Sequence, residues 1–161
     1  MTKAKSEAIH MKKYKLIKEK GTILKRLVAM RSFGNVSKDD KGGLIEKESN
    51  LSHEGNCWVS GDARVYGNAL VYGDARVYGD ARVSGNALVY GNAWVSGNAL
   101  VSGNAWVYGN AWVYGDAWVY GDARVSGRFD ITGKIDYELP RVELNTEKAK
   151  KLAKFLKELS K

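Results

Sequence analysis

The stretch that decides the fold runs from Gly55 to Ser126 and reads GNCWVS-GDARVY-GNALVY-GDARVY-GDARVS-GNALVY-GNAWVS-GNALVS-GNAWVY-GNAWVY-GDAWVY-GDARVS. It is one six-residue unit written 12 times without an insertion or a deletion. Each unit consists of Gly, then Asp or Asn, then Ala (Cys57 in the first unit), a variable residue, Val, and finally Tyr or Ser. A pattern this short and this regular indicates a solenoid, which builds its core by stacking its own repeats.

Within each unit, Ala, the variable residue and Val form a short strand. Ala and Val point to one side, whereas the variable residue and the following Tyr or Ser point to the other. The Gly-Asx pair supplies a tight turn, because Gly adopts positive φ freely and Asp and Asn tolerate it. The pattern therefore predicts a parallel β-helix with a narrow interior of Ala and Val. Cys57 occupies an Ala position, so we expect it to be a small buried side chain.

The repeats resemble the hexapeptide-repeat superfamily of left-handed parallel β-helices. In that family an aliphatic residue is followed four positions later by a small one, as Val65 is by Ala69 and Val71 is by Ala75. The resemblance implies three repeats per coil, and hence about four regular coils with a left hand. The expected fold class is all-β, a left-handed parallel β-helix with an N-terminal β cap and a C-terminal amphipathic helix.

The composition of the flanking segments divides the chain into four predicted parts. They are a disordered basic arm (1–13), an N-terminal β cap with a degenerate first coil (14–54), the β-helix (55–139) and the amphipathic helix (140–161). The formal net charge of +8 is concentrated outside the repeats. Lys-rich arms of this kind solubilise a protein or hold nucleic acid.

The N-terminal cap is predicted from two strand-like runs between Tyr14 and Met30. The runs YKLIKE and TILKRLVAM flank Lys20-Gly21, which indicates a hairpin. Residues 42–54 carry apolar side chains at an imperfect phase, as expected of a first coil. A solenoid needs such an atypical cap because the strand edges of its end coil are otherwise open.

The C-terminal end is predicted from a change of pattern after the last repeat. Phe129 takes an Ala position, and we expect its ring to plug the terminal coil. Pro140 cannot donate a ladder hydrogen bond, so it predicts the exit from the solenoid. Apolar residues from Ala149 to Leu159 then recur at helical spacing.

The cellular compartment is predicted from what the composition excludes. A single cysteine excludes an internal disulfide framework and fits a reducing cytoplasm. No apolar run approaches the roughly 20 residues needed to span a bilayer. We therefore expect a cytoplasmic protein with no membrane partner.

Stacking every third repeat sorts the outward side chains onto three faces, which we number in chain order. The variable positions of the first face hold Trp58, Arg76, Trp94 and Trp112. Those of the second face hold Arg64, Arg82, Leu100 and Trp118. Those of the third face hold Leu70, Leu88, Trp106 and Arg124, beside Tyr72, Tyr90, Tyr108 and Ser126.

The third face is the least polar of the three. Soluble monomers rarely expose a flat apolar strip of this size, and Tyr and Trp are typical interface anchors. The resemblance to the superfamily implies trimers packed around a three-fold axis. We therefore expect a homotrimer whose interface consists of Leu70, Tyr72, Leu88, Tyr90, Trp106 and Tyr108. The alternative is that the stacked aromatic side chains only reinforce the ladder.

The first and second faces carry the candidate ligand-binding residues. These are Trp94, Trp112, Arg76, Arg64 and Arg82. Exposed Trp and Arg side chains can stack on a base and bind an anion, which favours a small nucleotide-like ligand. The alternative is purely structural: Arg76 would make cation–π contacts to Trp58 and Trp94 in the coils on either side.

An enzymatic function is the first alternative. Many members of the superfamily are acyl-CoA-dependent acyltransferases with a histidine base, and others are metal enzymes with three His ligands. This chain has only His10 and His53, and neither matches the family's catalytic motif. We therefore predict no catalytic residue, no metal site and no cofactor.

The block RSFGNVSKDDKGGLIEKESNLSHEGNCWV, together with the repeats after it, resembles small proteins of bacteriophages and prophages. The resemblance implies a phage-type protein in the cytoplasm of a host cell. The expected function is a non-catalytic binding or assembly protein that binds a host factor or sequesters a small anionic ligand. A second alternative is weak, salt-dependent nucleic-acid binding through the basic termini.

Overall fold

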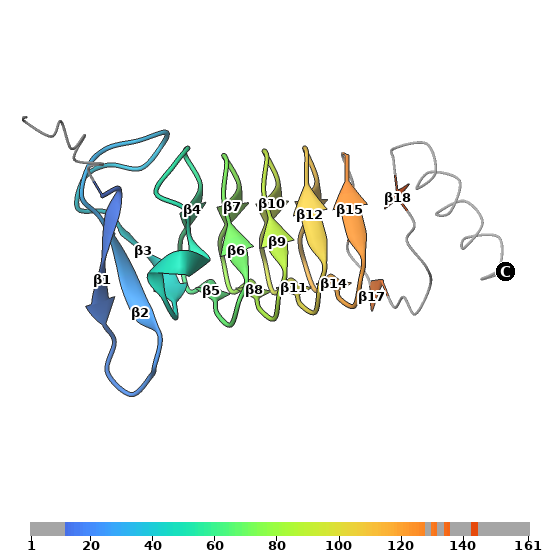
Figure 1. Ribbon diagram of the computed structural model, residues 1–161, viewed down its shortest axis with the longest axis horizontal. Helices are drawn as coiled ribbons and strands as arrows, with labels where there is room; N and C mark the ends of the chain where they lie inside the picture. Colours follow the sequence, from blue (N-terminus) through green and yellow to red (C-terminus); the bar gives the residue numbers. More distant parts are fainter. Residues whose placement is uncertain (1–11, 128–129, 132–133, 136–142, 145–161) are drawn as a thin grey trace, which may run out of the picture.

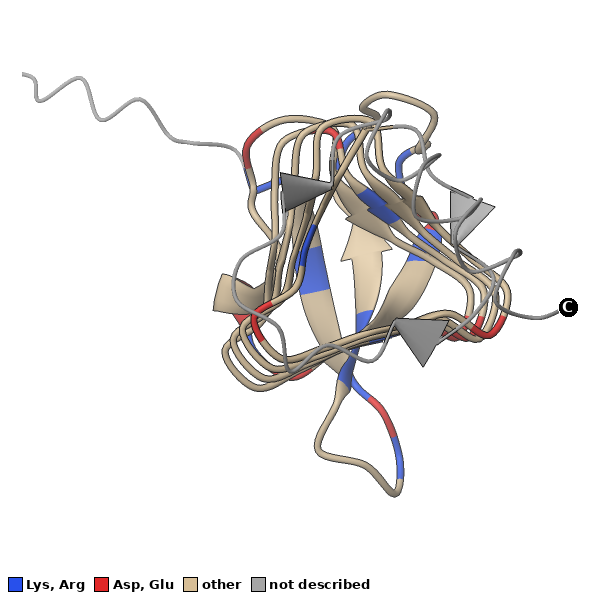
Figure 2. Ribbon diagram, turned by 90° about the vertical axis from the view of Figure 1, so that its right-hand side faces the viewer, with Lys and Arg blue, Asp and Glu red and all other residues tan. Residues whose placement is uncertain are grey.

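The computed structural model describes residues 12–127, 130–131, 134–135 and 143–144. They form a β-solenoid of about five turns, in which short parallel strands stack along the length of the molecule (Figure 1). Viewed along its long axis, the solenoid is a triangular prism (Figure 2). The all-β, coiled architecture that the repeat predicts is therefore confirmed.

Each side of the prism is one parallel ladder of two- or three-residue strands. The first face consists of β4 (Trp58–Val59), β7 (Arg76–Val77), β10 (Trp94–Val95), β13 (Trp112–Val113) and β16 (Asp130–Ile131). The second face contains β5 (Arg64–Val65), β8 (Arg82–Val83), β11 (Leu100–Val101), β14 (Trp118–Val119) and β17 (Lys134–Ile135). The third face consists of β6 (Leu70–Val71), β9 (Leu88–Val89), β12 (Trp106–Tyr108), β15 (Arg124–Ser126) and β18 (Glu143–Leu144).

The register confirms that each coil contains three repeats. Trp94 pairs with Trp112 on the first face, and Leu70 pairs with Leu88 on the third. Equivalent residues three repeats apart therefore lie directly above one another. As a result, each face carries the outward residues that the sequence assigns to it.

The interior of the prism is closely packed by the small inward residues. The Ala and Val side chains that point inward between Val59 and Val119 are at most 1% exposed. Burying one valine side chain contributes about 1.5 kcal/mol or more to the free energy of unfolding. Cys57 is also fully buried, which confirms the prediction that it takes an inward Ala position of the repeat.

The corners of the prism are built from the Gly-Asx pair of each repeat. The repeat glycines from Gly55 to Gly121 have φ between 64 and 71°, a region that side chains disfavour. Side chains at one corner also form a ladder that the turn pattern alone does not predict. Its amide and carboxylate groups are joined by hydrogen bonds from Asn68 to Asn86, from Asn86 to Asn104 and from Asn104 to Asp122.

The N-terminal cap is a hairpin that extends the second face. β1 (Tyr14–Lys18) and β2 (Lys25–Ala29) are antiparallel, as predicted. β2 also pairs antiparallel with β3 (Lys41–Ile45), and β3 pairs in parallel with β5. The hairpin thereby covers the strand edge of the first coil, which is the role expected of a cap.

Residues 42–54 form the degenerate first coil, as the sequence predicts. β3 supplies its second-face strand, and Leu51 bridges in parallel to Val71 on the third face. The short 3-10 helix η1 (Glu48–Asn50) lies between them. The buried amide of Asn50 donates to the carbonyl oxygens of Gly67 and Ala69, so a side chain replaces part of the backbone ladder here.

The solenoid continues further toward the C-terminus than predicted. The sequence predicts an exit at Pro140 and a helix over 140–161, but β18 lies beyond that proline and pairs in parallel with β15. Phe129, Pro140 and the helical pattern from Ala149 to Leu159 lie outside the described residues.

Candidate functional site

The first face presents a row of exposed aromatic side chains. The indole rings of Trp94 and Trp112 stack with their centroids 5.1 Å apart and their planes 5° from parallel. The ring of Tyr78 meets Trp94 edge to face at a centroid distance of 6.2 Å. Trp94 and Trp112 are each 36% exposed, and Tyr78 is 38% exposed. The stack arises because identical side chains at paired register positions lie one coil apart.

Two adjoining hollows lie on this face, where the last position of the repeat is serine. The larger, about 380 Å³, is lined by Tyr78, Trp94, Ser96, Trp112, Val113 and Tyr114. The smaller, about 240 Å³, is lined by Trp58, Ser60, Arg76, Tyr78 and Trp94. The sequence-based prediction rested on the variable position and missed Ser60 and Ser96. The signal that reveals them is the alternation of Ser and Tyr along the last position of this face.

Arg76 joins Trp94 and Trp112 on the first face, as predicted. It pairs in register with Trp58 on one side and Trp94 on the other. Among the residues that the structure describes, however, Arg76 makes no cation–π contact and no ion pair. The cation–π contacts that the structural alternative expects of Arg76 are therefore not made, whereas Trp94 and Trp112 do stack on each other. The guanidinium borders the smaller hollow instead.

Arg64 and Arg82 form a separate group on the second face. They are register partners on β5 and β8, and both are exposed. The turn of the N-terminal hairpin borders them, and a hollow of about 270 Å³ is lined by Thr22, Ile23, Leu24, Arg64, Tyr66 and Arg82. Two adjacent guanidinium groups favour an anion. The five predicted ligand-binding residues thus lie in two places, on the first and second faces.

The third face carries a continuous tyrosine stack. The ring of Tyr90 lies 4.8 Å from that of Tyr72 and 5.2 Å from that of Tyr108, and all three rings are nearly parallel. Burial raises the pKa of Tyr72 and of Tyr90. At the C-terminal end of the row, the guanidinium of Arg124 lies 4.3 Å from the ring centre of Trp106. All six predicted interface residues share this face.

Lys13 differs from the prediction of a disordered arm over residues 1–13. It is fully buried, and its ammonium group lies 2.9 Å from the carbonyl oxygen of Cys57 and 3.2 Å from the sulfur of the same residue. Burial lowers the pKa of Lys13 and raises that of the Cys57 thiol. No sequence signal separates this lysine from its Lys-rich neighbours. Residues 1–11, including His10, lie outside the described residues.

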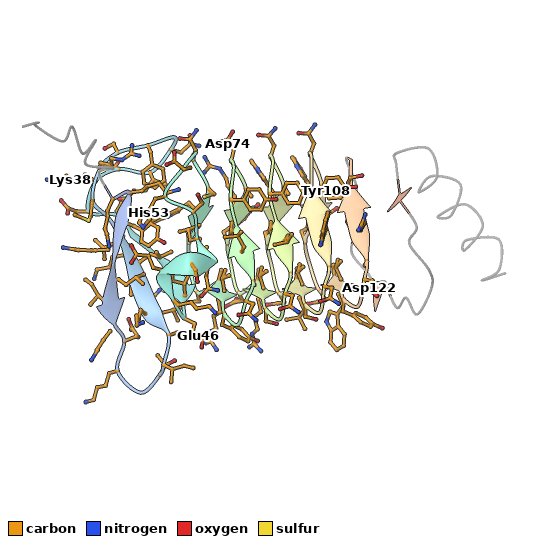
Figure 3. The ribbon with its side chains drawn as sticks, in the orientation of Figure 1. Lys38, Glu46, His53, Asp74, Tyr108 and Asp122 are labelled. Carbon is orange, nitrogen blue, oxygen red and sulfur yellow. The ribbon has the colours of Figure 1, made fainter. Side chains whose placement is uncertain are left out.

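His53 is held in the cap by both of its ring nitrogens (Figure 3). Nδ1 accepts a hydrogen bond from the backbone N–H of Lys13, so Nε2 donates to the Glu48 carboxylate at 2.7 Å. The imidazole also stacks on Tyr14 with a centroid distance of 4.2 Å. Hydrogen bonds from Lys12 and His53 lower the pKa of Glu48. In this arrangement His53 serves the packing of the cap.

The described residues contain no group of three His, Cys, Asp or Glu side chains arranged to hold a metal ion. The same residues include no helix with the length and apolar character needed to cross a membrane.

A comparison with protein-family models gives a match, and it lies within the repeats. The family model described as "YdcK Beta solenoid repeat" matches residues 58–73, 63–79, 69–84, 75–91, 81–97, 93–109 and 107–121. A comparison with the curated proteins finds no match. The matched segments are the stacked coils that carry the first-face hollows and the tyrosine row.

Proposed function

We propose that this β-solenoid repeat protein is a non-catalytic binding and assembly module. Three copies associate through the third face, and the first face stays open for a ligand or a partner protein. The phage-type resemblance favours a host factor as that partner and the host cytoplasm as the setting.

The observation that carries the proposal is the tyrosine row of the third face. Tyr90 has a neighbouring ring on each side, so both faces of its ring are covered within the chain. The row therefore offers ring edges, hydroxyl groups and the side chains of Leu70 and Leu88 to an approaching surface. A flat, rigid surface of this kind suits packing against protein. The three-fold arrangement itself is taken from the superfamily resemblance.

The contacts of His53 favour binding over catalysis. Acyl transfer in the superfamily needs a histidine nitrogen that accepts a proton from the substrate. Here one nitrogen of His53 receives the N–H of Lys13 and the other bonds to Glu48. Acyl transfer remains the enzymatic alternative, and turnover with acetyl-CoA that His53→Ala abolishes would support it.

A small anionic ligand is the alternative to a host factor. Two features favour it, namely the Arg64–Arg82 pair beside the hairpin turn and Arg76 at the smaller first-face hollow. Native mass spectrometry of freshly purified protein tests this alternative, because a retained ligand adds its mass to that of the assembly. Weak nucleic-acid binding through the basic termini would instead give an affinity that falls steeply with salt.

The assembly is tested by the double variant Leu88→Glu with Tyr90→Lys. It places two charges in the middle of the proposed interface, and we expect native mass spectrometry to show a trimer for the unmodified protein and a monomer for the variant. The matched control is Leu100→Glu with Ser102→Lys, at the same repeat positions on the second face. We expect this control to stay trimeric. A third-face variant with the mass of the unmodified assembly would contradict the proposed interface.

A further inference from the structure

The third face carries a continuous tyrosine stack, and the equivalent row of the first face lacks its middle ring. On the third face every coil from Tyr72 to Tyr108 contributes a ring, with centroid spacings of 4.8 and 5.2 Å. On the first face the corresponding positions hold Tyr78, Ser96 and Tyr114, with Ser96 one coil from each tyrosine. The middle ring of the stack is thus replaced by a hydroxymethyl group.

The ring of Tyr78 has the orientation that stacking requires. It meets Trp94 of the next coil at 6.2 Å and 81°. Tyr90 meets Trp106 of the next coil in nearly the same way, at 6.4 Å and 72°, and Tyr90 stacks on the following tyrosine. Tyr78 therefore turns its face toward the space above Ser96, where the third face has a further ring.

The space above Ser96 is the larger hollow of about 380 Å³. A ring placed there would lie one coil from Tyr78 and one coil from Tyr114, a separation within the range of stacked aromatic pairs. The walls are Trp94 and Trp112, and the floor is Ser96, which is largely buried. The Ser96 hydroxyl thus lines the hollow, and it can donate a hydrogen bond to the polar edge of a ring or accept one from it.

The adjoining hollow adds a positive charge. It shares Tyr78 and Trp94 with the larger hollow and is bordered by Arg76 and Ser60. Arg76 has no acidic partner among the residues that the structure describes. A ligand whose ring lies above Ser96 can therefore direct an anionic substituent toward the Arg76 guanidinium.

We propose that the gap above Ser96 binds one planar heteroaromatic ring, that of a small nucleotide, with its phosphate directed toward Arg76. The proposal gives the small-ligand alternative of the proposed function a site and a ligand class. It does not depend on the trimer. Stacking supplies the affinity for the ring, because a base between two aromatic side chains stacks on both of its faces.

Ser96→Tyr tests the gap without any ligand. The new ring should complete the stack between Tyr78 and Tyr114, so we expect the melting temperature to rise. Ser102→Tyr is the matched control on the second face, where the neighbouring coils offer Ser84 and Tyr120 and thus only one ring. We expect a smaller rise for the control. A Ser96→Tyr variant with a lower melting temperature than the unmodified protein would contradict the proposal that the gap holds a ring.

Ligand binding is tested with adenosine monophosphate by equilibrium dialysis. We expect saturable binding to the unmodified protein, no binding of ribose 5-phosphate, and a loss of at least about tenfold in Ser96→Tyr. Arg76→Gln should weaken the binding of adenosine monophosphate but not that of adenosine. Absence of saturable binding to the unmodified protein, or equal affinity in Ser96→Tyr and Ser102→Tyr, would overturn the nucleotide proposal. Native mass spectrometry of Ser96→Tyr should still show the trimer, which separates this failure from failure of the assembly.

Discussion

At the scale of single residues, the corner glycines set the strictest requirement of the fold. Gly85 has a φ of +67°, and a β-carbon built on it would lie 2.9 Å from both the N and the O of Gly103 in the next coil. Gly21, in the turn of the hairpin, has a φ of +78° but no atom within 4 Å of such a β-carbon. A side chain at Gly21 would therefore meet backbone strain alone, whereas one at Gly85 would meet both strain and a clash with the adjacent coil.

We expect Gly85→Ala to lower the free energy of unfolding by about 3 kcal/mol or more, because strain and a backbone clash act together. Gly21→Ala should cost about 1–2 kcal/mol, since only the left-handed conformation is penalised. Urea denaturation followed by circular dichroism measures both. Equal losses in the two variants would mean that the coils separate to accommodate a β-carbon.

At the scale of elements, the side chains of the N-terminal hairpin differ in how deeply they are buried. Leu27 of β2 is fully buried, whereas Ile17 of β1 is 47% exposed. The ammonium of Lys25 and the guanidinium of Arg26 also bond to backbone carbonyl oxygens of Glu46 and Gly42. The cap is thus held by an apolar contact and by charged side chains that satisfy the carbonyl groups of the first coil.

We expect Leu27→Ala to lower the free energy of unfolding by about 2–5 kcal/mol, the cost of a cavity at a buried leucine. Ile17→Ala on the same hairpin should change it by less than about 0.5 kcal/mol. Chemical denaturation provides the comparison. Because the cap covers open strand edges, Leu27→Ala should also aggregate sooner than Ile17→Ala at equal concentration. A stable, non-aggregating Leu27→Ala would show that the first coil does not need the hairpin.

At the scale of the whole molecule, the fully buried titratable groups among the described residues gather at one end. The inward-facing side chains of the repeats after Cys57 are only Ala and Val. In contrast, Lys13, Tyr14 and Cys57 are buried where the cap meets the first coil. The Tyr14 hydroxyl donates to the carbonyl oxygens of Leu51 and Glu48 at 2.6 and 2.9 Å. Burial raises the pKa of Tyr14 well above its usual value. Tyr14 therefore contributes to the response of the fold to alkaline pH, as do Tyr72 and Tyr90 of the third face.

The raised pKa of Tyr14 predicts a loss of stability above about pH 10, the usual phenol pKa. The folded protein keeps this proton while the unfolded chain releases it, so the stabilising contribution is complete below that pH and declines above it. Tyr14→Phe should cost about 1 kcal/mol at pH 7. The difference between the two proteins should then shrink by up to about 1.4 kcal/mol per pH unit. Urea denaturation at pH 7 to 11 measures it, and a constant difference would contradict the assignment.

The sequence by itself determined the repeat, the three faces and the residues on each, because the period of six fixes which side chains point outward and which coils stack. It also predicted the hairpin, the first coil and the burial of Cys57 from local patterns. Only the tertiary structure decided the burial of Lys13, the contacts of His53, and the continuation of the ladder through β18. These features depend on contacts between distant segments. The gap above Ser96 depends on both. The sequence contains the alternation of Ser and Tyr, but this alternation produces a hollow only when the coils stack.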